Sequence, residues 1–242
     1  MKENKLKNTF LYIALLIVFS ASAQKEDLKK LCVHLDEVLK AATPLHLEYN
    51  MTIQADSDEP ETGGSMQMSF YKKGDHHFKM VMGNEQILLR EGKMMLQVNN
   101  ANKSIIIQED STLVSNDQTM ITELKGLVDS AVSVEYSKEK DVLTYILKFK
   151  SAFAYTSIKL NFSAKTELLN SMHAEFNPSY PEPYQSLTVT YTLWDLKWKE
   201  GVGFFDFKQF VDKKDDKYIP VSAFSTYKVF QPEKGRLNVN LK

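Results

Sequence analysis

The sequence predicts an α+β protein: one large curved antiparallel sheet, an incomplete β-barrel of about 10–11 strands, with an N-terminal helix and an inserted lid helix. Three observations predict this fold class. Short segments in which apolar and polar residues alternate, as in half-buried strands, recur along most of the chain between turn residues. Only two segments, near 24–42 and 115–130, have the three- and four-residue apolar spacing of helices. A sheet with so many strands accumulates twist and curls, so its concave face must be filled.

The composition limits the classes of function. The chain has 242 residues, of which 43% are apolar and 25% charged, as in an ordinary globular protein. Its formal net charge of −1 gives no electrostatic footprint for a nucleic-acid partner. The single cysteine, Cys32, excludes an intramolecular disulfide.

The N-terminal residues have the pattern of an export signal. Three lysines precede an uninterrupted apolar run, residues 10–19, which is too short to span a bilayer comfortably. The small residues 21–23 then fit the cleavage pattern of signal peptidase. We interpret residues 1–23 as a cleaved signal peptide, with an uncleaved anchor as the alternative, and expect residues 24–242 to form a single domain without a transmembrane span. This predicts an exported, periplasmic protein of a Gram-negative bacterium, with a net charge near −3 after cleavage.

The segment 65–108 predicts five short strands joined by tight turns. Turns such as Gly83-Asn84 and Glu91-Gly92-Lys93 supply the backbone conformations that short hairpins require. Because side chains alternate along a strand, we expect an antiparallel meander with one apolar face. Six of the ten methionines fall between Met66 and Met95, which is the most unusual local feature of the chain.

The two predicted helices stand before and inside the series of strands. Residues 24–42 form an amphipathic helix, and Cys32 lies in its apolar stripe as a small buried hydrophobe. The second helix starts at the capping residues 115–117 and ends near Ser130. It interrupts the strands, which resume near 132–137, 142–150, 155–162, 168–177 and 187–197.

The last part of the chain is rich in aromatic residues. The aromatic segment, from Trp194 to Phe210, is interpreted as ordinary core, with a docking surface for a partner as the alternative. A charged hairpin tip at 212–217 follows it. Residues 218–230 are then predicted as one further strand.

Several motifs occur in the order in which a known family has them. His77-Phe78-Lys79-Met80 is followed by the apolar strand 86–89, the turn Glu91-Gly92-Lys93 and the strand 94–98. In this order and lettering, residues 26–200 resemble the outer-membrane lipoprotein carrier (LolA/LolB-like) half-barrel superfamily, as a divergent member. The resemblance implies an incomplete barrel whose apolar concave face, covered by helices, holds acyl chains. Lys79 stands where the carriers have an arginine, and the aromatic-rich C-terminal third departs from the family.

The methionine-rich side of the meander and the inserted helix are the candidate ligand site. Unbranched, polarisable thioethers repack readily around irregular apolar ligands. The alternative is that these residues only pack against one another as core. The candidate residues of the apolar cavity are Met66, Met68, Phe70, Phe78, Met80, Met82, Leu89, Met94, Leu96, Leu124, Leu127 and Val128.

Catalytic and metal-binding motifs are not recognised. His76 and His77 are neighbours and point to opposite sides of a strand, and the acidic residues near Asp212 lack the pattern of a calcium loop. The sequence has no G-x-S-x-G elbow, no H-E-x-x-H motif and no glycine-rich phosphate loop. We therefore expect a protein that is not an enzyme, without a metal or another cofactor.

The leading hypothesis is a periplasmic carrier or binding protein that holds a lipid or a lipoprotein acyl chain in the concave apolar face. The alternative is a non-enzymatic component of envelope assembly, with a filled core and a protein partner. The two hypotheses differ in one observable, an apolar cavity of roughly 300 Å3 or more between the meander and the helices.

Overall fold

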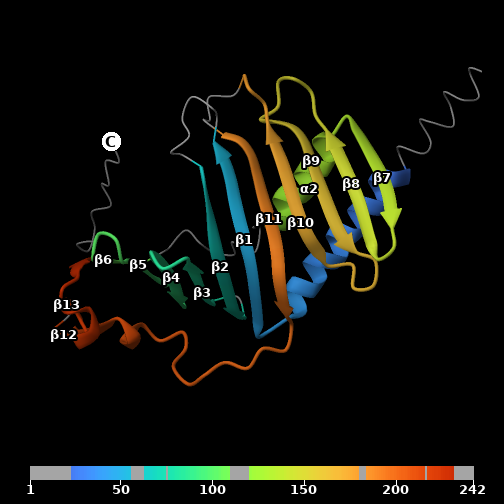
Figure 1. Cartoon of the computed structure of the whole chain (residues 1–242). Coiled ribbons are helices and arrows are strands. Elements are labelled where there is room, and N and C mark those ends of the chain that lie inside the picture. Colours follow the sequence, from blue (N-terminus) through green and yellow to red (C-terminus); the bar gives the residue numbers. More distant parts are fainter. Residues whose placement is uncertain are drawn as a thin grey trace, which may run out of the picture. The chain divides into compact units, whose positions relative to one another are not determined.

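The computed structural model describes residues 23–55, 63–74, 76–109, 120–179, 184–215 and 217–231. Within these residues, twelve strands form one sheet in the order β14-β6-β5-β4-β3-β2-β1-β11-β10-β9-β8-β7, which is open at β14 and β7. The strands of this sheet (Figure 1) are β1 (Leu45–Ala55), β2 (Gly64–Lys73), β3 (His77–Met82), β4 (Gln86–Glu91), β5 (Met94–Asn99), β6 (Ser104–Glu109), β7 (Ser133–Glu139), β8 (Val142–Lys148), β9 (Tyr155–Ser163), β10 (Leu169–Phe176), β11 (Tyr184–Asp195) and β14 (Lys228–Phe230). A separate two-stranded hairpin consists of β12 (Val211–Lys214) and β13 (Lys217–Pro220).

The predicted fold class is confirmed: the protein is α+β, with a curved, mostly antiparallel sheet that does not close into a barrel. The sheet has more strands than the 10–11 expected. The prediction of one strand over 218–230 is wrong, because this stretch is divided into β13, the short 3₁₀ helix η4 (Ser222–Phe224) and β14. The N–H of Val221 still donates to the carbonyl oxygen of Phe210, at 3.0 Å, and η4 begins at the next residue. β14 then pairs with β6 in parallel, a connection that no local pattern indicates.

Two helices accompany the strands, as predicted. The first covers residues 23–41 and the second, α2, is described over Met120–Ser130. The predicted signal peptide up to residue 22 and the capping residues 115–117 lie outside the described residues. No helix in the described part of the chain is long and apolar enough to cross a membrane.

The chain divides into two compact units, which are described in turn below. The first contains residues 1–41, 51–65 and 118–191, and the second contains residues 42–50, 66–117 and 192–242. The expectation of a single domain over 24–242 stays a prediction.

In the first unit, both helices lie on the same side of strands β7 to β10 (Figure 1). Directly opposed residues of antiparallel strands share a face, and the pairing of Val134 with Leu147 and of Leu147 with Ile158 collects apolar side chains on one face. Cys32 of the first helix is fully buried, as predicted. The largest buried side chains of this core are Leu28, Leu35, Leu147, Ile158, Leu160, Phe162 and Leu169.

Polar contacts hold the two helices beside each other. Lys29 pairs with Asp129 at 2.9 Å, and Asp36 pairs with Lys125 at 3.6 Å. Lys25 Nζ also donates to the carbonyl oxygens of Asp129 and Ala131, at 2.9 and 3.2 Å. A cation at this place stabilises the carbonyl groups that the end of α2 leaves without helical partners.

In the second unit, β2 to β6 form the predicted five-strand meander in an unbroken antiparallel register. Gly74, Gly83 and Gly92 in its turns have φ of 62°, 53° and 62°, the left-handed region that glycine tolerates without strain. The glycines from which these turns were predicted therefore do form the turns of the hairpins.

One face of the meander is covered by the C-terminal part of the chain. Leu89, Leu96 and Ile107 are almost fully buried there against Phe205 and Phe207. We call this face of β2 to β6 the covered face. Its cluster of buried residues consists of Leu89, Leu96, Val98, Ile105, Ile107, Phe205, Phe207, Phe210 and Val211.

Candidate functional site

The strand register gathers most of the sequence-predicted site residues on the other face of the meander. Met68 pairs with Met82 and Phe70 pairs with Met80 across β2 and β3, so these four side chains share a face. Phe78 and Met66 follow by alternation along the same two strands. We call this the methionine face, and it consists of Met66, Met68, Phe70, Phe78, Met80 and Met82.

Three site residues of the meander lie on the opposite side, which corrects the expectation of a single apolar face. Leu89 pairs with Lys79 and Leu96, and both neighbours of Lys79 on β3, Phe78 and Met80, point to the methionine face. Leu89 and Leu96 therefore lie on the covered face, together with Met94. The sequence did not reveal these two faces, because β4 and β5 have apolar residues at successive positions. Such a run does not show which alternate residues point to which face of the sheet.

The three candidate residues of the inserted helix belong to the core of the first unit. Leu124 is 3% exposed and Val128 is 0% exposed, while Leu127 is partly buried. This degree of burial is that of packed core side chains. Of the predicted site, the structure brings together the six residues of the methionine face.

The methionine face is only partly closed. Met68 is 6% exposed, whereas the other five residues are neither buried nor fully exposed. His46 stacks on Tyr71 of the covered face, with ring centroids 4.2 Å apart, so its neighbours Leu45 and Leu47 point to the methionine side and are buried. Burial is thus deepest at β1 and decreases across β2 to β3.

Two cationic residues stand at one end of the methionine face. Lys72 pairs with Phe78, and Phe78 pairs with Arg90, so the three side chains form a row across β2, β3 and β4. Arg90 is only 5% exposed, and its Nε donates to the carbonyl oxygen of Gly92 at 3.0 Å. An apolar surface that ends in a row containing a guanidinium suits an apolar chain with an anionic end.

On the covered face, Lys79 is enclosed by aromatic rings. Its Nζ lies 4.5 Å from the centroid of the Phe204 ring and 5.7 Å from that of Phe210. It also donates to Oε1 of Gln209 at 3.2 Å. Burial lowers the pKa of Lys79, because it disfavours the charged ammonium. Lys79 is thus a contact for the C-terminal segment.

The aromatic segment packs as core, which confirms the interpretation from the sequence. The alternative, a docking surface for a partner, is not supported. Phe205, Phe207 and Phe210 are 4–7% exposed against the covered face. Trp198 and Phe204 are partly buried in the same cluster, with ring centroids 4.9 Å apart. Large side chains in this state have little surface left for a partner.

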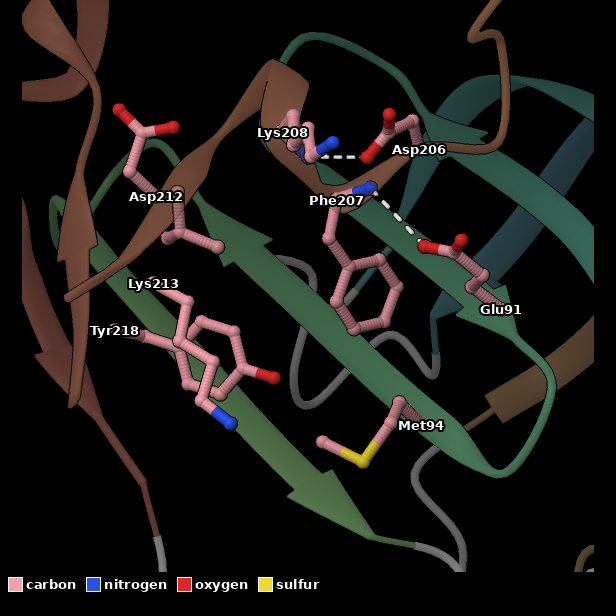
Figure 2. Close-up of a pocket in the computed structure, with 9 residues that line it drawn as sticks. Glu91, Met94, Asp206, Phe207, Lys208, Asp212, Lys213 and Tyr218 are labelled. Atoms are coloured by element: carbon pink, nitrogen blue, oxygen red, sulfur yellow. Dashed lines mark hydrogen bonds between the residues drawn. The ribbon is translucent and has the colours of Figure 1, made fainter. Parts of the chain in front are cut away.

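An open groove lies beside the C-terminal hairpin, a feature that the sequence analysis missed. It has a volume of about 560 Å3 and is shown in Figure 2. A smaller groove of about 180 Å3 shares Glu91 and Asp206 with it. The larger groove is lined by Glu91, Met94, Asp206, Phe207, Lys208, Val211, Asp212, Lys213 and Tyr218.

We call the larger groove the hairpin groove; it has an apolar floor and a rim of mixed charge. The Phe207 ring points toward Met94, while the Phe207 N–H donates to Glu91 Oε2 at 3.4 Å (Figure 2). Asp206 Oδ1 accepts from the N–H of Lys208 at 2.8 Å and caps the short helix η3 (Phe207–Gln209). Only Met94 of the predicted site lines this groove. No local pattern indicates it, because its walls come from segments more than 100 residues apart.

Metal-binding geometry does not occur in the described residues, where no three His, Cys, Asp or Glu side chains gather in a cluster that could hold an ion. His77 lies near Phe205, with ring centroids 6.2 Å apart, and contributes to the smaller groove.

Comparisons with known proteins return structural similarities only. No protein-family model matches the chain, and no curated protein matches it. Among solved structures, it is similar to a LolA-superfamily protein from Nitrosomonas europaea, with 9% identity, 73% of this chain and 96% of that chain covered, and a TM-score of 0.35. It is also similar to an uncharacterized conserved protein from Thermus thermophilus (6% identity, 85% and 99% covered, TM-score 0.47) and to LprF from Mycobacterium bovis (8% identity, 70% and 93% covered, TM-score 0.41).

Proposed function

We propose that this protein binds a lipid-like molecule, an acyl chain with an anionic end, on the methionine face, and serves as a carrier or binding protein of the bacterial envelope. The observation that carries the proposal is the register of β2 and β3, which places six large, flexible or aromatic apolar side chains on one face. Five of them are neither buried nor fully exposed. Thioethers adapt to ligands of irregular shape, which suits acyl chains of different lengths.

The covered face supports this assignment because it already provides a hydrophobic core for the second unit. The buried cluster of the second unit consists of side chains from the covered face and the C-terminal segment, and contains none of the six residues of the methionine face. This unit therefore has a hydrophobic core that does not depend on those six residues. Apolar surface beyond the needs of a core is a common mark of a binding site.

The polar end of the ligand would lie toward the row of Lys72 and Arg90. Arg90 shares the methionine face with Phe78 and Met80 and is held at the strand end by its bond to Gly92. The positive charges of Lys72 and Arg90 would attract a carboxylate or phosphate to this end of the face and so orient the chain. The proposed ligand class is therefore a fatty acid or an anionic phospholipid.

We propose the periplasm as the place of action, because residues 1–23 have the sequence pattern of an export signal. A protein there meets lipids and acylated lipoproteins of both membranes. We propose an acylated envelope molecule, rather than a soluble metabolite, as the natural ligand.

Native mass spectrometry of the protein purified from the periplasm, with lipid extraction of the same sample, tests the proposal. We expect a mass increment that corresponds to an acylated species recovered in the extract. The same measurement on Met80→Lys protein should show no increment, because a lysine in the middle of the face introduces a charge where the chain would lie. A ligand-free mass that stays unchanged after incubation with fatty acids and phospholipids would overturn the proposal.

A further inference from the structure

Five aromatic side chains form a continuous cluster at one end of the first unit. Phe149 and Phe153 stack with ring centroids 4.7 Å apart and planes 7° apart, and Tyr155 lies 6.4 and 6.3 Å from them. Phe176 follows at 5.2 Å from Tyr155, and Tyr184 at 6.0 Å from Phe176. None of the five is buried. We call this cluster the aromatic end.

The position of the aromatic end follows from the antiparallel order of the strands. The end of β8, the start of β9, the end of β10 and the start of β11 lie at the same end of the first unit, at the top of Figure 1. The core of the unit is filled by other residues, such as Leu147, Ile158 and Leu160. The five rings are therefore additional apolar surface at the sheet end.

The loop that carries Phe153 is held in place by Asn177, which is 9% exposed. Asn177 Nδ2 donates to the carbonyl oxygens of Ser151 and Phe153, and the Asn177 N–H donates to that of Ala154 at 2.9 Å. The Phe153 N–H donates to the carbonyl oxygen of Lys150 at 2.9 Å. A loop fixed in this way presents its aromatic ring without a large entropy cost on binding.

Three exposed charged residues, two basic and one acidic, lie next to rings of the cluster in the sequence. Lys148 and Lys150 flank Phe149 in the sequence, and both are exposed. The acidic residue next to Phe176 is Glu175, whose Oε2 accepts from the Ser157 hydroxyl at 2.7 Å. Phenylalanine and tyrosine rings that are flanked by lysines match the interface of a bilayer with anionic headgroups.

We propose that the aromatic end docks the protein on the surface of an anionic lipid bilayer. The rings enter the headgroup region, and Lys148 and Lys150 contact lipid phosphates. This surface is separate from the proposed ligand site, with which it shares no residue. The two proposals can fail separately, because vesicle binding is measured on ligand-free protein and ligand binding without vesicles.

Flotation with vesicles tests the docking surface. We expect the wild-type protein to float with vesicles of phosphatidylethanolamine and phosphatidylglycerol, and to float less at high salt or with pure phosphatidylcholine. Phe153→Ser should reduce the bound fraction about tenfold, since a large apolar group no longer enters the interface. The matched control is Val202→Ser, which removes a fully exposed apolar side chain from the second unit and should leave flotation unchanged.

Thermal melting of each variant separates loss of docking from loss of folding, and Lys150→Glu, at an exposed position, provides a second variant that keeps the rings. Lys150→Glu should weaken flotation with anionic vesicles only. A wild-type protein that floats with neither kind of vesicle overturns the proposal and assigns the cluster to a protein partner. Equal flotation of folded Phe153→Ser and wild-type protein overturns it as well.

Discussion

Lys79 and Gln209 join the meander to the C-terminal segment: Lys79 Nζ donates to Gln209 Oε1 at 3.2 Å, across 130 residues of sequence. The amide nitrogen of Gln209 donates in turn to the carbonyl oxygens of Gly203, Phe204 and Asp206, at 2.6, 2.8 and 3.2 Å. One side chain thus fixes the turn that places Phe204 over Lys79. The two residues hold the aromatic segment against the covered face.

Gln209→Ala should destabilise the protein by about 1 kcal/mol, because it removes the donor of the turn and the acceptor of Lys79 at a largely exposed site. Urea unfolding, followed by tryptophan fluorescence, measures this change. The control Lys208→Ala is exposed and adjacent, and should change the unfolding free energy by less than about 0.5 kcal/mol. Equal effects of the two substitutions would show that Gln209 has no special role in the turn.

Met80→Lys should abolish binding of a fluorescent fatty acid while the melting temperature changes little, because Met80 is only partly buried. Titration of the probe and a thermal melt of the same sample provide both readouts. Gln67→Lys is the matched control, an exposed position on the neighbouring strand β2 where an added lysine should not affect the probe. A strongly destabilised Met80→Lys protein would instead identify the methionine face as packed core.

Leu124→Ala should cost about 2–5 kcal/mol, the range for a leucine removed from a packed core. Gly126→Ala, two positions along α2, should instead stabilise the protein by up to about 1 kcal/mol. An added Cβ at Gly126 meets nothing within 4 Å, and alanine favours the helix. Chemical denaturation compares the two variants. A small loss for Leu124→Ala would support a movable lid in place of a core helix.

The unfolding free energy should decrease between pH 9 and 12, and Cys32→Ala should reduce this decrease. Burial raises the pKa of the Cys32 thiol from 9.0 to about 12, so the unfolded chain releases this proton at a lower pH than the folded protein. The stabilisation is complete below pH 9 and is lost as the pH rises toward 12, by at most about 1.4 kcal/mol per pH unit. Urea titrations at several pH values measure the slope.

The decrease should remain in part in Cys32→Ala protein, because burial also raises the pKa of Tyr145 to about 12. Identical slopes for the wild type and Cys32→Ala would contradict the assignment to the thiol. The effect of the substitution itself on stability is separated by comparing both proteins near neutral pH, about two units below the ordinary thiol pKa, where neither group titrates.

The elements that could be predicted from the sequence are those that local chemistry specifies. The helix over 23–41, the five strands of the meander and their glycine turns follow from apolar spacing and from residues that accept positive φ. The same alternation placed Met66, Met68, Phe70, Phe78, Met80 and Met82 together before any pairing was known. Cys32 in the apolar stripe was identified as buried for the same reason.

Which faces are covered, and by which segments, depends on contacts between residues that are distant in the sequence. Leu89 and Leu96 are as apolar as the methionines, and the contact with Phe205 and Phe207, more than 100 residues later, determines that they are core. Met94 packs against the same cluster and is partly buried. The parallel pairing of β14 with β6 and the bond between Lys79 and Gln209 are equally distant in sequence. Alternation shows that a strand has two faces. Burial of either face depends on which distant segment packs against it, and this depends on the tertiary structure of the whole chain.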